Sequence, residues 1–195
     1  MTPILHYRVL SCGRGQYAFY QIGLKKWGLL NIYAPNNARD RMVLWKSILS
    51  QLPSVDHWAI VGDFNMLEDV CDRVGGRSHT IDGSKLYEWE RLIFYLGLMD
   101  LWHVSCFVGL QDYLVYSRSD RRELHSNLSR LDRFYVDKFL WDKRGSIGIL
   151  PSFSFSDHAP LRLVIVLHEH YKTSRFKNPN HVFLRQDCVP PVIYC

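Results

Sequence analysis

Long apolar runs are absent from this chain of 195 residues. The longest stretch worth testing as a membrane span, Leu161–Leu167, contains Arg162 and falls far short of the roughly 20 apolar residues that a spanning helix needs. The first residues also lack a basic region followed by a long apolar one. We therefore expect neither a transmembrane helix nor a signal peptide, and no membrane partner.

Glycine, proline and cysteine are scarce as well. With only 12 Gly and 8 Pro, a collagenous or low-complexity chain is excluded. The 5 cysteines are scattered without a C-x-x-C pair, which favours reduced thiols in an intracellular protein, nuclear or cytoplasmic, over a disulfide framework or a zinc site. A hydrophobic content of 47% predicts one globular domain, and a net charge of +5 is compatible with a polyanionic partner without establishing one.

Short aromatic and β-branched runs alternate with segments of helical periodicity along the chain. Helices are predicted from Asp40 to Leu52 and from Ser84 to Leu96. Strands are predicted at Gln16–Ile22, Trp27–Tyr33, His57–Val61, Arg133–Val136, Ile147–Leu150 and Leu161–Leu167, with the first two forming a hairpin. The interleaving indicates an α/β (α+β) domain over residues 1–168, followed by a weakly structured tail over residues 169–195.

Four clusters place carboxylates, amides or histidine beside apolar runs: Asn31–Asn36 (NIYAPN), Gly62–Asn65 (GDFN), Ser129–Phe134 (SRLDRF) and Ser156–Pro160 (SDHAP). Together they supply oxygen ligands for Mg²⁺ (or Mn²⁺), a carboxylate to orient water, an amide to hold a phosphate and a histidine to stabilise developing charge. This combination points to metal-assisted hydrolysis of a phosphoester. A Ser–His nucleophile is disfavoured, because the serine and histidine of the fourth cluster, two apart on an extended chain, run parallel instead of converging.

Each cluster also has an ordinary structural interpretation. Asp63 and Asn65 are common turn residues, and Asp132 could form a salt bridge with a flanking arginine. His158 could be a histidine of the surface or core, and Tyr33 could serve packing alone. The joint occurrence of the clusters in this order favours the functional interpretation.

The order NIYAP, GDFN, RLDRFYV and SDHAP resembles the endonuclease/exonuclease/phosphatase superfamily over about residues 16 to 168. This superfamily includes apurinic/apyrimidinic endonucleases, deoxyribonuclease I and the endonuclease domains of non-LTR (LINE-type) retrotransposons. The stretches Asp72–Gly76 and Gly97–Trp102 are similar to plant elements of the last type. The resemblance implies a four-layer α-β-β-α sandwich of two packed mixed β-sheets, with the site at one sheet edge.

The resemblance also implies roles for residues in each cluster. Asp63 matches the aspartate that orients or activates the attacking water, and Asn65 matches the amide that holds the phosphate. Asp132 matches the carboxylate that pairs with the catalytic histidine, and His158 matches that histidine. Tyr33 matches the tyrosine on the phosphate side.

The same resemblance makes Asp157 the metal-site aspartate and DNA the partner of what is expected to be a monomer. Contacts to DNA are expected mostly with the phosphate backbone, from a rim around the site. The residues assigned to them are Asn36, Arg39, Arg118, Arg121, Arg122 and Arg130. The basic stretch around Arg121 and Arg122 could equally be a solvated loop.

One departure concerns the metal. The superfamily has an asparagine on its first strand and a metal-binding glutamate on its second, whereas residues 1–30 contain no Glu, Asp or Asn. The chain therefore looks like a fragment that starts after those strands, with weak cation binding and little or no nicking of DNA expected. Two alternatives are a phosphatase of the same superfamily, acting on inositol phosphates or RNA ends, and a non-catalytic remnant that binds nucleic acid.

Overall fold

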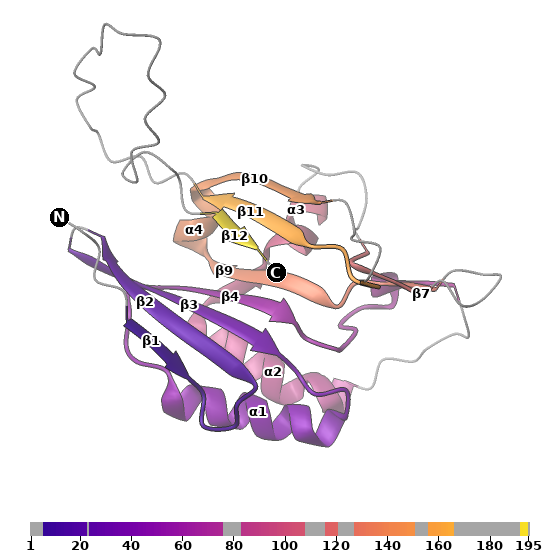
Figure 1. The fold of residues 1–195 in the computed structure, drawn as a ribbon, viewed down its shortest axis with the longest axis horizontal. Coiled ribbons are helices and arrows are strands. Elements are labelled where there is room, and N and C mark those ends of the chain that lie inside the picture. Colours follow the sequence, from indigo (N-terminus) through magenta and orange to yellow (C-terminus); the bar gives the residue numbers. More distant parts are fainter. Residues whose placement is uncertain are drawn as a thin grey trace, which may run out of the picture.

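A six-stranded mixed sheet forms the centre of the molecule (Figure 1). The computed structural model describes residues 6–22, 24–75, 83–107, 116–120, 127–150, 156–165 and 192–194. The strand order of the large sheet is β1 (His6–Val9), β2 (Gly15–Ile22), β3 (Lys25–Tyr33), β4 (His57–Asp63), β9 (Asp132–Asp137) and β6 (Leu98–Asp100).

Two smaller sheets and the helices complete the described fold. One sheet has the order β10 (Arg144–Ile149), β11 (Leu161–Ile165) and β12 (Val192–Tyr194), and the other β5 (Arg73–Val74), β8 (Asn127–Ser129) and β7 (Arg118–Asp120). The helices are α1 (Ala38–Gln51), α2 (Gly83–Leu96), α3 (Leu101–Phe107), α4 (Lys138–Asp142) and a 3₁₀ turn at Val70–Asp72. The predicted mixed class of helices and strands is confirmed.

The predicted hairpin is confirmed, since β2 and β3 pair antiparallel from Gly15 opposite Ile32 to Ile22 opposite Lys25. The strand β1, which pairs with β2, is not apparent in the sequence. Its four residues are too few to show a period. It becomes a strand because β2 offers it an edge to pair with.

The first predicted helix connects two parallel strands, as a crossover must. It begins after Asn37, whose side-chain oxygen accepts a hydrogen bond of 2.8 Å from the backbone N–H of Arg39. Helix α1 then lies against one face of the sheet together with α2 (Figure 1), and β4 runs parallel to β3.

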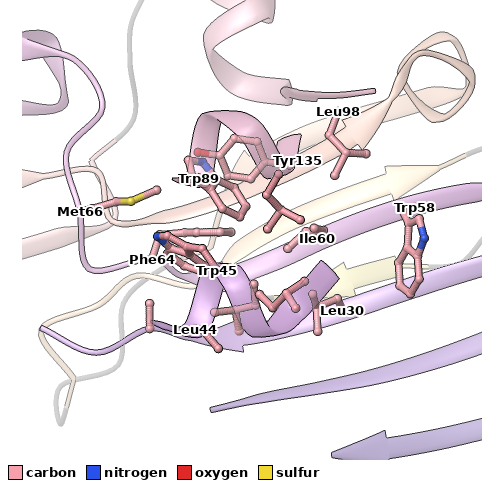
Figure 2. Packing of buried hydrophobic residues seen from close by; sticks show 14 of the residues in the cluster. Leu30, Leu44, Trp45, Trp58, Ile60, Phe64, Met66, Trp89, Leu98 and Tyr135 are labelled. Carbon is pink, nitrogen blue, oxygen red and sulfur yellow. The ribbon is translucent and has the colours of Figure 1, made fainter. Parts of the chain in front are cut away.

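Strand β4 is buried on both faces, which explains its nearly continuous apolar sequence. Ile60 points toward α1 and α2, into a core that contains the rings of Trp45 and Trp89, with centroids 4.7 Å apart (Figure 2). Phe64 and Tyr135 join the same aromatic group.

The alternate residues of β4 and β9 face the opposite way, toward the sheet of β10 to β12. Val61 and Phe134 pack there against Leu163 of β11 in a second apolar cluster. Because side chains alternate along a strand, Asp63 and Asp132 continue these two rows beyond the end of the apolar cluster. The fold thus puts two carboxylates at one end of the seam between two sheets.

At the C-terminal end, residues 192–194 form β12, which pairs with β11. The remainder of the predicted tail and residues 166–167 lie outside the described residues, so the domain boundary at residue 168 stays a prediction. Within the described part of the chain, no helix combines the length and apolar character needed to cross a bilayer.

Candidate active site

Three of the predicted site residues stand in one row across the large sheet. Asp63, at the end of β4, lies opposite Tyr33 on β3 and opposite Asp132 on β9. Residues directly opposite on neighbouring strands present their side chains on the same face. The strand register therefore brings together residues from three of the four sequence clusters.

The GDFN segment owes its conformation to backbone contacts. Gly62 has φ +132°, and a Cβ there would stand 1.9 Å from the carbonyl oxygen of Ile32, so only glycine fits. The backbone N–H of Asn65 donates to Oδ1 of Asp63 at 2.9 Å, and the side-chain Nδ2 of Asn65 donates to the carbonyl of Ala34 at 2.8 Å. These bonds hold the carboxylate of Asp63 and the amide of Asn65 in fixed relative positions.

His158 approaches the row from the other sheet, just before β11. Its Nδ1 lies 2.7 Å from Oδ2 of Asp132, within hydrogen-bond distance. Asp132 is buried and His158 is half-buried. The hydrogen bond to Asp132 raises the pKa of His158, although burial of the ring works in the opposite direction. The pair therefore favours a cationic imidazole, and Asp132 pairs with His158 rather than forming the salt bridge considered from the sequence.

Ser117 holds this pair in place and was not identified from the sequence. Its buried Oγ accepts the backbone N–H of Asp132 at 3.0 Å, and its carbonyl accepts the backbone N–H of Ala159 at 2.7 Å. Ser117 thus joins the strand of Asp132 to the segment of His158. No local signal marks it, because a single serine before a strand is common.

The carboxylate of Asp63 sits in an unfavourable electrostatic environment. Burial and the charge of Asp132 raise its pKa, while the hydrogen bond from Asn65 opposes the shift. Ligand atoms of Asp63, Asp132 and His158 all lie within 4.8 Å of one another, which is close enough to hold a metal ion. Asp132 and His158 are, however, already joined to each other by the contact between Oδ2 and Nδ1 at 2.7 Å.

Asp157, the predicted metal ligand, lies beside the pair but faces solvent, with 56% of its side chain exposed. Its Oδ2 accepts a hydrogen bond of 3.0 Å from Nε of Arg118 on β7. Burial alone would raise the pKa of Asp157. The hydrogen bond from its own backbone N–H and the charges of His158 and Arg118 outweigh burial and lower that pKa. Asp157 is therefore ionised at neutral pH and already faces one cation.

The prediction that Arg130 lies on the rim and contacts DNA is wrong. Only 2% of the residue is exposed, and its guanidinium binds the carboxylates of Asp72, at 2.8 Å, and Asp100. Arginine is mostly exposed in proteins, so an exposed position was the natural expectation. Its buried partners lie far away in the sequence and only the fold brings them together.

Comparison with known proteins found one related sequence and several related folds. No family model matches the chain. A 149 kDa protein of the transposon TX1 from Xenopus laevis is 28% identical over 160 residues, which are 80% of this chain and 11% of that protein. The chain thus spans about a tenth of that relative.

Solved structures of two nucleases and a phosphatase superimpose on this chain. An AP endonuclease from Leishmania major has a TM-score of 0.59 with 18% identity, covering 77% of this chain and 54% of that one. The endonuclease domain of the telomere-specific non-LTR retrotransposon TRAS1 has a TM-score of 0.59 with 14% identity, covering 85% and 70%. The 3' phosphatase NExo from Neisseria, bound to a DNA hairpin, has 0.56 with 15% identity, covering 85% and 72%.

The chain has the endonuclease/exonuclease/phosphatase fold. In this fold the row of Tyr33, Asp63 and Asp132 stands at the ends of three neighbouring strands.

A cleft of about 560 Å³ opens beside this row. It is lined mainly by polar and cationic side chains: Asn36, Arg41, Asn65, Met66, Leu67, Arg73, Arg118, Asn127, Ser129 and Leu131. Of the residues assigned to DNA contacts, Asn36 and Arg118 line it, and Arg39 is exposed in the first turn of α1. Arg121 and Arg122 lie outside the described residues.

Titration of the histidine offers a direct test of the pair in this endonuclease/exonuclease/phosphatase fold. We expect the NMR-monitored pKa of His158 to lie above its ordinary value of about 6.5 and to fall when Asp132 is replaced by asparagine, because the hydrogen bond to the carboxylate is the main cause of the increase. The ion pair then stabilises the fold fully below about pH 6.5 and loses its effect as pH rises through the folded-state pKa. An unchanged His158 titration in Asp132→Asn would contradict the assignment.

Proposed function

We propose that this chain carries the hydrolytic site of a Mg²⁺- or Mn²⁺-dependent DNA endonuclease domain of retrotransposon origin. The observation that carries the proposal is the convergence of Asp63, Asp132 and His158 at one end of the seam between the sheets, beside Asn65 and a cationic cleft. The similarity to the TX1 protein and to the TRAS1 endonuclease domain supports the retrotransposon origin. We assign to the domain a four-layer α-β-β-α sandwich, in which α1 and α2 cover one face of the large sheet and the sheet of β10 and β11 packs on the other face.

The chemistry follows from the placement of each group. Asp63 orients a water molecule and accepts its proton as the water oxygen attacks phosphorus, since a raised pKa brings the carboxylate closer to the working pH of a base. Asn65 and Tyr33 hold oxygens of the phosphate. The imidazolium of His158, favoured by Asp132, donates a hydrogen bond where negative charge develops on the phosphorane. As the new phosphorus–oxygen bond forms, one phosphorus–oxygen bond of the strand breaks. The leaving oxygen takes a proton from solvent and becomes a hydroxyl, so one water molecule is consumed overall.

The side chains of this site suit a hard divalent cation. The three carboxylates, Asp63, Asp132 and Asp157, face only two cationic groups, those of Arg118 and His158. Asp157 would hold the ion, together with oxygens of the substrate and water. When bound, the ion polarises the phosphoryl group and neutralises charge. Since Arg118 already engages Asp157, we expect weak affinity for the cation and slow hydrolysis.

Supercoiled plasmid DNA tests the proposal, since a single nick converts it into the open circle and it has no ends for a phosphatase or exonuclease. We expect slow nicking that increases with the Mg²⁺ or Mn²⁺ concentration into the tens of millimolar. EDTA should stop it, and Asp63→Asn should reduce it by about 10²-fold or to background.

Three outcomes would decide between the candidate functions. If the parent chain nicks the plasmid no faster than Asp63→Asn at any cation concentration, the proposal of an endonuclease is contradicted. Release of phosphate from a phosphorylated oligonucleotide end or an inositol phosphate, with the plasmid intact, would favour the phosphatase. Binding of DNA without any hydrolysis would favour a non-catalytic remnant.

A further inference from the structure

The small sheet of β5, β8 and β7 carries a row of side chains of which only Arg118 has been given a role. Ser129 on β8 lies directly opposite Arg73 on one side and Arg118 on the other. Opposite residues share a face of the sheet, and Asn127, two positions from Ser129, shares it too. All four line the cleft, so this face of the sheet forms one of its walls.

The row leads to the catalytic pair. Arg118 is also bridged to His158, so the order across the strands is Arg73, Ser129, Arg118 and His158. Adjacent strands are spaced by about 4.8 Å, which puts the backbones of Arg73 and His158 on the order of 14 Å apart. A DNA strand carries one charge per roughly 3.4 Å of helix axis, so the row is long enough for more than one phosphate.

The arginines that line the cleft differ in what they bind. Arg41 donates from Nη1 to the carbonyls of Pro35 and Asn36, at 3.0 and 2.7 Å, and Arg118 donates to Asp157. Nε of Arg73 is buried and has no hydrogen-bond partner among the described residues. A guanidinium stays charged at any physiological pH, and a buried donor without a partner costs free energy. Arg73 therefore has a position on the cleft wall and a charge that no described carboxylate neutralises, and both suit the binding of an anion.

We propose that Arg73 and Ser129 form a second phosphate site, which holds a phosphodiester of the DNA strand next to the scissile one. The guanidinium supplies charge and a forked set of donors, and the serine hydroxyl supplies another donor. The row places this site and His158 on one line. A DNA strand carries several phosphates in succession, so this arrangement suits a DNA strand better than a single free anion. The inference rests on the proposed function, because it takes His158 as the position of the scissile phosphate.

The salt dependence of binding measures this contact directly. Binding of a fluorescent duplex is followed by anisotropy in EDTA at several salt concentrations, so that no cleavage is needed. Losing one phosphate contact should reduce the slope of log K against log salt by about 0.9 in Arg73→Gln and weaken binding. Arg73→Lys should keep the slope, because the charge remains, and bind less tightly, because the fork is lost.

A matched control removes the same charge elsewhere. Arg91 lies exposed on α2 and pairs with Glu88, so Arg91→Gln should leave the slope unchanged. Equal slopes for Arg73→Gln and Arg91→Gln, or no duplex binding by the parent chain, would overturn the inference. Inorganic phosphate can also be added as a competitor of the duplex. If Arg73→Gln changes that competition but leaves the salt slope of DNA binding unchanged, the site binds a free anion and the inference is overturned. Failure of the proposed function would be seen separately, because the chain would not nick plasmid DNA although Arg73→Gln still reduced the salt slope of DNA binding.

Discussion

Asp132→Asn is expected to lower the rate of plasmid nicking by about 10²-fold to 10⁴-fold, or to the cation-free background, with little effect on DNA affinity. Asp132 lies 2.7 Å from Nδ1 of His158 and favours its charged form. Asparagine removes that charge, so the ring loses its proton at lower pH and stabilises the transition state less. The rate should be measured at the highest cation concentration used for the parent chain, with DNA binding measured in parallel.

His158→Ala and the double variant extend this test. Residues that act as a unit show strongly non-additive effects, so the double variant should be about as slow as either single one. The chain provides a matched control in His57 and Asp137, which form a second pair at 2.7 Å at the opposite ends of β4 and β9. Asp137→Asn should leave nicking by the folded protein unchanged. Equal rates for Asp132→Asn and Asp137→Asn would show that Asp132 has no part in the chemistry.

Asp72→Ala is expected to destabilise the fold by about 3–5 kcal/mol, which is enough to unfold a marginally stable domain. Asp72 is fully buried, with 0% exposed, and binds Arg130 at 2.8 Å and Arg133 at 2.6 Å. Its Oδ2 also accepts the backbone N–H groups of Glu68 and Asp69. Burial opposes the shift, but the two arginines lower the pKa of Asp72, so it is ionised. Alanine would leave two buried guanidinium groups short of their counter-charge.

Urea denaturation, followed by the intrinsic tryptophan fluorescence, measures the effect. The control is Asp142→Ala, which breaks an exposed ion pair with Lys138. Exposed pairs of this kind contribute little, so the control should change the free energy of unfolding by no more than about 0.5 kcal/mol. If Asp72→Ala and Asp142→Ala unfold at the same urea concentration, the buried cluster does not stabilise the fold as argued. Arg130 and Arg133, the partners of Asp72, flank Asp132 in the sequence. If Asp72→Ala loses nicking at a temperature where it is still folded, the substitution has therefore displaced Asp132.

Local patterns in the sequence were sufficient for the longer strands and for part of the site. The apolar run His57–Val61 predicted a buried strand, and the structure extends it to Asp63 with burial on both faces. The order of the GDFN, RLDRFYV and SDHAP clusters predicted that their polar residues meet. Asp63, Asp132 and His158 do meet, because the alternation along β4 and β9 carries both carboxylates onto the face that His158 approaches.

The partners of the charged groups could not be read from the sequence. The sequence places Arg130 on the rim that contacts DNA, whereas the structure buries it against Asp72. The sequence resemblance makes Asp157 a metal ligand, whereas in the structure it pairs with Arg118. The row of Arg73, Ser129 and Arg118 exists only because three short strands pair in one register. Periodicity reports which face of its own strand or helix a residue occupies, and that is a local property of the chain. The partner of a charged side chain is decided by segments that lie 30 to 61 residues away in the sequence. Whether water screens such a pair depends on how deeply packing buries it.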